Sequence, residues 1–356
     1  MKSLLSLCLA AGYFTSAGRH AVPSYVDITW MSITNMYYEL GPLRIVTDGF
    51  ISRVPASQFH GGGGGMGQTD APQTPDVAAV RRVIDALGGP SHVNLLLTGH
   101  SHFDHSFDTG TWSTLTGARI MGSQTTCFQV IAQHIPRDWC SVVKGGETIQ
   151  LADGVTMRVV RWNHSGDPAI NPEQHNPVEL DSVPHLDPVT GGLKVGVAED
   201  FPNGGGGRAF LFTVDGPDGR FSWFFQNSAS PVDLALPIVV GGVDYGAPIE
   251  NLKAAMRDAG LQSVDLWIGT GGTPVAQLVV PVLKPRTFLP VHWDGLSGPF
   301  LAGVPKPYAD PALDSFLSSA GVRLITPVQY MDKWRLDRTG VRSMDNTTVK
   351  HALGFD

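Results

Sequence analysis

Residues 95–108 read LLLTGHSHFDHSFD, and this stretch decides both the fold class and the chemistry of the chain. Directly after the apolar run, three histidines and two aspartates fall within the nine residues 100–108. A short apolar run is typical of a strand buried on both faces, and α/β proteins place their chemistry at the carboxyl ends of such strands. Imidazole and carboxylate together suit a borderline cation such as zinc. The stretch therefore predicts a metal site, which we favour over a solvated loop.

The whole chain has 356 residues, which is within reach of one large α/β domain, and 42% of them are hydrophobic. Its formal net charge is −7, and no basic run or stripe of basic and aromatic residues is present. These features argue against nucleic acid as a partner. Beyond the N-terminus no run of about 18 apolar residues occurs, so no later segment is expected to span a membrane.

Residues 1–20 resemble a secretory signal peptide. One lysine precedes an apolar run from Leu4 to Phe14, and small residues follow it. The alternative is an N-terminal strand or helix that packs on the domain. We therefore expect a periplasmic or secreted protein, with a cytoplasmic location as the alternative. Cys127 and Cys140 are expected to pair if the chain is exported and to be buried thiols otherwise.

Strands and helices recur along the chain in two comparable halves, which predicts an α/β fold with two sheets between layers of helices. Strands are expected at residues 26–30, 43–47, 93–97, 118–122, 155–162, 208–214, 221–226, 265–269, 287–291 and 322–326. Helices are expected at residues 76–87, 123–135, 249–259, 274–283 and 310–320.

Residues 163–207 show little periodicity and are rich in proline, glycine and asparagine. A loop of this length inside a compact domain is usually functional or disordered. We expect it to form a cap-like insertion over the site, with a plain surface loop as an equally weighted alternative. The glycine runs at residues 61–65 and 204–207 lack the strand-turn-helix context of a phosphate-binding loop.

The sequence HSHFDH at residues 100–105 matches the HxHxDH signature of the metallo-β-lactamase superfamily, which the chain also resembles in the order of its other motifs. Asp48-Gly49 follows an expected strand, as in the first motif of that family, where the aspartate braces the metal loop. His164 in VVRWNHSGD and His292 in TFLPVHWDG match later motifs. The resemblance implies that residues 25–356 form an αββα sandwich with a metal site between the upper edges of its two sheets.

The resemblance also implies two sets of ligands, which are His100, His102 and His164 for one ion and Asp104, His105 and His292 for a second. The chain departs from the family at the fourth motif, where Gln226-Asn227 stands in place of the usual Gly-Asp. An uncharged amide bridges two cations poorly, and two dications a few ångströms apart repel each other. We therefore expect one firmly bound zinc ion at the second set, with Asn227 as a terminal ligand, and a second ion that is weak or absent.

The expected chemistry is hydrolysis by metal-activated water. Asp104 is placed to orient that water and accept its proton, and no GxSxG nucleophile motif occurs. Phe103 and Trp293 stand beside expected ligands and are candidate substrate-binding residues, with core packing as their alternative role. No cluster of arginine or lysine accompanies the motifs, which disfavours phosphodiester substrates.

These patterns predict a zinc-dependent hydrolase of a small, largely apolar molecule, with an ester or lactone as the leading substrate class. A hydrolytic dehalogenase of an activated aromatic halide is the first alternative, and a non-catalytic metal-binding protein of the same fold is the second. The expected partner is the substrate alone, without nucleic acid or a membrane span, and a homodimer is left open.

Overall fold

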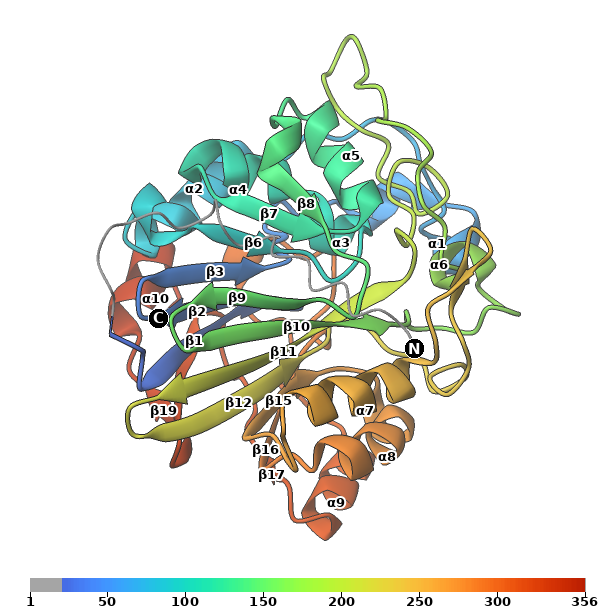
Figure 1. Ribbon diagram of the computed structural model, residues 1–356. Helices are drawn as coiled ribbons and strands as arrows, with labels where there is room; N and C mark the ends of the chain where they lie inside the picture. Colours follow the sequence, from blue (N-terminus) through green and yellow to red (C-terminus); the bar gives the residue numbers. More distant parts are fainter. Residues whose placement is uncertain (1–20, 356) are drawn as a thin grey trace.

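Two large β-sheets lie face to face in the computed structural model, which describes residues 21–355. The candidate signal peptide at residues 1–20 lies outside the described residues. The first sheet has the strand order β19-β18-β1-β2-β3-β6-β7-β8, and the second has the order β17-β16-β15-β12-β11-β10-β9. Helices α2, α4 and α5 lie on the outer side of the first sheet, and α7, α8 and α9 lie on the outer side of the second (Figure 1). This is the αββα sandwich expected from the sequence.

The first sheet consists of β1 (Tyr25–Ser32), β2 (Asn35–Leu40), β3 (Leu43–Thr47), β6 (Leu95–Leu97), β7 (Arg119–Gly122), β8 (Cys140–Val142), β18 (Asp332–Asp337) and β19 (Gly340–Met344). The second consists of β9 (Thr148–Ala152), β10 (Val155–Trp162), β11 (Gly207–Gly216), β12 (Gly219–Phe225), β15 (Leu266–Gly269), β16 (Thr287–Pro290) and β17 (Arg323–Leu324). Two small hairpins are formed by β4 (Phe59–His60) with β5 (Gln68–Thr69) and by β13 (Val239–Val240) with β14 (Val243–Asp244).

The helices are α1 (Gly62–Gly65), α2 (Val77–Ala86), α3 (Phe103–Ser106), α4 (Thr109–Thr116), α5 (Gln124–Ala132), α6 (Pro172–His175), α7 (Pro248–Asp258), α8 (Gly272–Leu283), α9 (Pro311–Ser319) and α10 (Thr347–Leu353). Within residues 21–355, none of them combines the length and the apolar character that crossing a bilayer requires.

The two-residue period of the strands explains how the second sheet packs on both faces. In β11, Phe210 and Phe212 point into the core between the sheets, whereas Ala209 and Leu211 pack with α7, α8 and α9. Tyr38 of β2 stacks at 5.7 Å on Trp223 of β12, so aromatic side chains join the two sheets directly. Both faces of this sheet are covered, which is why its strands read as nearly continuous apolar runs.

The structure confirms the expected strands and helices, and it adds elements that the patterns did not indicate. Strands β18 and β19 return to the first sheet, where β18 pairs antiparallel with β1. Only Trp334 and Leu336 of β18 are buried, because its other side chains are polar and half-exposed. Arg335 forms an ion pair with Asp27 of β1 at 2.6 Å, so this charged strand is recognisable only beside its neighbour.

A disulfide joins Cys127 of α5 to Cys140 of β8. It closes a short loop at the edge strand of the first sheet, and a crosslink of this span stabilises by about 3 kcal/mol. We expect the double replacement of both cysteines by serine to lower the free energy of unfolding by about that amount, as measured by urea denaturation. The wild-type protein under a reducing agent should show the same loss, and the double variant should no longer respond to that agent. Equal stability of all forms would show that the bond does not form.

Candidate metal centre

Three connections that follow carboxyl ends of strands bring the ligand-type side chains together, and the first of them contains α3. The loop after β6 carries His100 and His102, α3 carries Asp104 and His105, the loop after β10 carries His164, and the loop after β16 carries His292. Asp48 holds the first of these connections in place, because the Gly99 N–H donates to Asp48 Oδ1 at 3.0 Å. The convergence puts side chains nearly 200 residues apart in sequence into one centre.

The six side chains form two groups. In each group the ligand-type atoms lie within 4.8 Å of one another, and the groups are His100, His102, His164 and Asp104, His105, His292. In the second group, Asp104 Oδ2 lies 3.1 Å from His105 Nε2 and 3.2 Å from His292 Nε2. The groups are adjacent, since the His100 and His105 rings have centroids 4.0 Å apart. Five of the six residues are buried, and the His292 side chain is 26% exposed.

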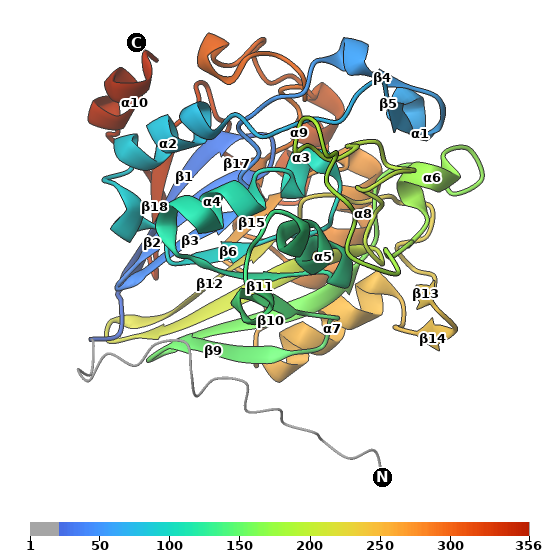
Figure 2. The same cartoon turned by 90° about the horizontal axis from the view of Figure 1, so that it is seen from above.

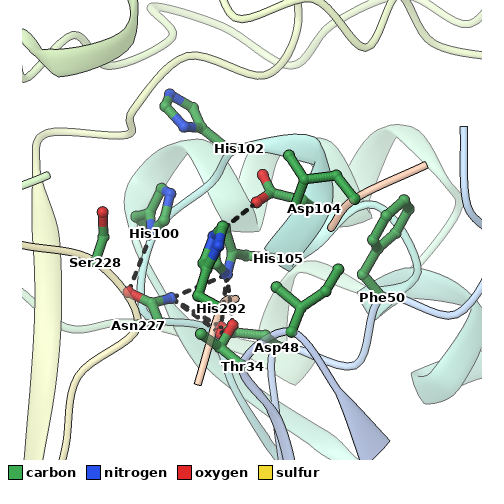
Figure 3. A network of polar contacts seen from close by, with 12 residues as sticks. Thr34, Asp48, Phe50, His100, His102, Asp104, His105, Asn227, Ser228 and His292 are labelled. Atoms are coloured by element: carbon green, nitrogen blue, oxygen red, sulfur yellow. Dashed lines mark hydrogen bonds and ion pairs between the residues drawn. The ribbon is translucent and has the colours of Figure 1, made fainter. Parts of the chain in front are cut away.

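Hydrogen bonds at Nδ1, the ring nitrogen on the side away from the centre, orient three of the imidazole rings. His100 Nδ1 lies 3.2 Å from Asn227 Oδ1, and His164 Nδ1 lies 2.8 Å from the Ser165 carbonyl oxygen. His105 Nδ1 lies 3.0 Å from Asp48 Oδ2 (Figure 3). Because these acceptors require a proton on Nδ1, each ring presents Nε2 to the centre.

Several buried nitrogens of the centre lack a hydrogen-bond partner. These are Nε2 of His100, His102 and His105, although His105 Nε2 lies near the Asp104 carboxylate without hydrogen-bond geometry. Burying such nitrogens unpaired is costly, so native proteins rarely leave several together. A cation in either group would accept electron pairs from the nitrogens of that group, and the donor set therefore fits a metal ion.

The electrostatics differ between the two groups. Burial, together with the neighbouring imidazoles, lowers the pKa of His100 and His164 well below the usual range, and burial lowers that of His102 to about 3. Burial opposes charge on His105 too, but Asp104 and Asp48 outweigh it and raise its pKa to about 10. Burial raises the pKa of Asp104, but His105 and His292 hold it well below the usual range. The first group is therefore neutral, and the second pairs the ionised Asp104 carboxylate with a protonated His105, whose proton a bound cation would displace.

Asp48 braces the centre, as its place before the histidine motif suggested. It adopts a left-handed conformation with φ of 59°. Its carboxylate accepts hydrogen bonds from Thr34 Oγ1 at 2.7 Å and from the Gly99 N–H, besides its contact with His105. One buried anion thus connects three separate segments of the site, which explains the strained backbone at this position.

Asn227, the expected terminal ligand, makes its contacts behind the histidines, and its role as a ligand stays a prediction that these contacts do not favour. Its Oδ1 is engaged with Nδ1 of His100, and its Nδ2 donates to both Asp48 oxygens at 3.1 and 3.0 Å. The amide lies against Gly99, where a Cβ would be 2.2 Å from Asn227 Nδ2. It therefore lies beneath the histidines, on the side away from their free Nε2 atoms (Figure 3).

Phe103 and Trp293, the expected substrate-binding residues, do not line the wall of an open pocket. Phe103 is 1% exposed and packs against Phe59 at 4.6 Å and Phe50 at 5.7 Å. Trp293 is partly exposed, stacks on Trp30 at 5.5 Å and donates from Nε1 to the Pro290 carbonyl. The structure thus gives Phe103 the packing role that was its alternative, and it gives Trp293 packing contacts as well.

The insertion at residues 163–207 folds against the glycine-rich loop that contains α1. The Val197 N–H donates to the Met66 carbonyl, and a Cβ on Gly63 would lie 2.5 Å from Val197 Cγ2. At the end of the insertion, a Cβ on Gly204 would lie 2.1 Å from Ser101 Oγ of the histidine motif. The low-complexity glycine runs therefore permit close contact between the insertion and the loops around the centre. Figure 2 shows α6 of the insertion beside α1.

His175 is a residue of this region that the sequence patterns left without a role. It is 3% exposed, and its Nε2 lies 2.6 Å from Asp233 Oδ2. Its partner follows 58 residues later in a loop without a recognisable motif. No local sequence signal could have paired the two residues.

Two sheets between helical layers, with two ligand-type groups where loops from both sheets meet, define a fold of the metallo-β-lactamase type. The chain is 28% identical over 142 residues to a UPF0173 metal-dependent hydrolase of Pyrobaculum islandicum, and the match covers 40% of this chain. The chain spans about half the length of that curated relative, since 52% of it is matched. No protein-family profile matches the chain.

Solved structures with a similar fold cover most of the chain. The metallo hydrolase Igni18 from Ignicoccus hospitalis has a TM-score of 0.48 and 12% identity, covering 88% of this chain and 99% of its own. An isothiocyanate hydrolase from Delia radicum gut bacteria has a TM-score of 0.49 and 10% identity, covering 89% of this chain and 100% of its own. The metallo-β-lactamase fold protein YhfI from Bacillus subtilis has a TM-score of 0.46 and 9% identity, covering 88% of this chain and 99% of its own.

Proposed function

We propose that this protein is a metal-dependent hydrolase that firmly holds one zinc ion at Asp104, His105 and His292. One observation carries the proposal, namely that six ligand-type side chains converge in two adjacent groups in which three buried imidazole nitrogens have no hydrogen-bond partner. The curated relative is named as a metal-dependent hydrolase, which agrees with the proposal.

The ligand-type residues support both the choice of zinc and the proposal of one firmly bound ion. Imidazole-rich sites with a carboxylate suit zinc better than magnesium or calcium. Asp104 is the one carboxylate in the two groups, and Asp48 stands behind His105, where it raises the basicity of that imidazole. Two dications a few ångströms apart with a single carboxylate between them repel strongly, so the three-histidine group is expected to bind weakly.

A zinc ion held by such ligands supplies a Lewis acid and lowers the pKa of a coordinated water to about 7. Asp104 is the residue of the protein that we expect to act on this water, because its ionised carboxylate lies at the middle of the second group. Besides holding the ion, this carboxylate would orient the attacking water and accept its proton as general base. His292 has the most exposed side chain of that group, and we infer that substrate arrives from its side.

The surroundings favour a small apolar ester or lactone as substrate. Beside the histidine motif lies an apolar cluster that includes Phe50, Val54, Phe103 and Leu193, with Met66 and Leu186 packed against it. These residues come from the loop after β3, from α3 and from the insertion. Since the core of this cluster is buried, its partly exposed members Met66 and Leu186 are the ones that could face a substrate, and they suit an uncharged organic molecule better than a phosphate ester. The disulfide supports the further proposal of an oxidising compartment, periplasmic or extracellular.

A substrate panel combined with metal analysis tests the proposed function. We expect hydrolysis of an aryl ester or a lactone that is lost with a chelator and restored by zinc, while phosphodiester and β-lactam substrates react poorly. Protein dialysed without added metal should retain about one equivalent of zinc. Two equivalents that survive dialysis would contradict the single firm site, and no hydrolysis of any ester, lactone or chloroaromatic substrate would favour a non-catalytic protein.

A further inference from the structure

His175 lies at the end of α6 and uses both of its ring nitrogens inside the protein. Nδ1 lies 3.0 Å from the Ser165 carbonyl oxygen, and Nε2 lies 2.6 Å from Asp233 Oδ2. A carbonyl and a carboxylate only accept hydrogen bonds, so both ring nitrogens must donate and the ring is an imidazolium. Burial lowers the pKa of His175, but Asp233 and the Ser165 carbonyl outweigh it and raise the pKa.

The Ser165 carbonyl oxygen also receives the Nδ1–H of His164 at 2.8 Å. A carbonyl oxygen has two lone pairs and can accept both donors. A continuous chain of hydrogen bonds therefore runs from Asp233 through His175 and Ser165 to His164, a member of the three-histidine group.

The Asp233 end of this chain of hydrogen bonds is fixed between two loops. Asn163 Nδ2 donates to Asp233 Oδ1 at 2.7 Å and to the Ser230 carbonyl at 2.8 Å. The Ser165 N–H donates to Ser228 Oγ at 2.8 Å, so the loop after β10 and the loop after β12 are joined on both sides of His164. These contacts hold the backbone beside His164, whereas the direction of the Ser165 carbonyl oxygen is fixed from outside the His164 ring by the His175 donor.

We propose that His175, with Asp233 as its counterion, is a positioning residue that holds His164 in its metal-binding orientation. The proposal rests on the proposed metal centre and adds a residue of the insertion to it. Without the His175 donor, the Ser165 carbonyl can rotate toward solvent, and His164 then loses its fixed tautomer. Partners in this position change metal affinity by about 10- to 100-fold when they are removed.

The test compares His175→Ala with His185→Ala, an exposed histidine of the same insertion, as the matched control. Zinc titration of metal-free protein against a competing chelator should show at least tenfold weaker binding to the three-histidine group in His175→Ala. The control should match the wild type. Cobalt(II) in the same group gives a visible spectrum that depends on ligand geometry, and His175→Ala should alter it.

Because the alanine variant could also loosen the insertion, Asp233→Asn serves as a second variant that keeps the side-chain volume. It should also weaken zinc binding. The double variant should bind zinc no more weakly than His175→Ala alone, as expected for two residues that act through the same chain of hydrogen bonds. Zinc binding and cobalt spectra unchanged in both folded variants would overturn the positioning role. Wild-type protein that binds no zinc would instead overturn the proposed function, and the positioning role with it.

Discussion

Asp104→Asn is expected to lower hydrolysis by about 10³-fold and to remove the firmly bound zinc ion. The carboxylate is the one anionic member of the two ligand-type groups, and it contacts both His105 and His292. An amide of the same shape cannot accept a proton from water, and loss of a general base costs about 10²- to 10⁴-fold. The expected change is therefore in kcat and in the metal content, with folding largely retained.

The measurement combines steady-state kinetics on the best ester or lactone with metal analysis after dialysis. Asp153→Asn, on the exposed turn between β9 and β10, is the matched control and should behave as the wild type. Excess zinc added to Asp104→Asn should restore little activity, because the missing group is also the proton acceptor. A variant that keeps its zinc and more than a tenth of its activity would remove Asp104 from the proposed role.

The sequence patterns were sufficient for the fold and for the residues that the centre collects. Each ligand-type side chain follows a strand whose apolar character is visible locally, and His100, His164 and His292 therefore stand in the expected order. The convergence itself depends on how the two sheets pack, because β6 lies in the first sheet and β10 and β16 are separated strands of the second.

What the patterns could not show is the direction in which a side chain points. Asn227 was expected to face the centre because it stands where the resembled family has an aspartate, yet its amide turns beneath His100 and meets Asp48. Phe103 was expected on a pocket wall, but the insertion and the loop after β3 bury it. Such outcomes depend on contacts between segments far apart in the sequence, and those contacts leave no periodicity in the sequence.

Asn227→Asp is expected to destabilise the protein by about 3–5 kcal/mol and to leave the zinc content at or below that of the wild type. Asn227 is 1% exposed, and its Nδ2 donates to both oxygens of Asp48. The substitution replaces this donor by an acceptor and puts two buried carboxylates about 3 Å apart. An uncompensated buried charge costs about that much.

The alternative is that Asn227 stands where a carboxylate would bridge two ions, and it makes the opposite prediction. Asn227→Asp would then bind two equivalents of zinc and keep its stability, because the second cation would offset the added charge. Urea denaturation and metal analysis of the same preparation therefore separate the two cases. Asn227→Ala removes the amide without adding charge and should cost about 1–3 kcal/mol, so the difference between the two variants isolates the electrostatic repulsion. Since the hydrogen bonds to Asp48 hold the amide beneath the histidines, we expect Asn227→Asp to be destabilised and not to bind a second equivalent of zinc.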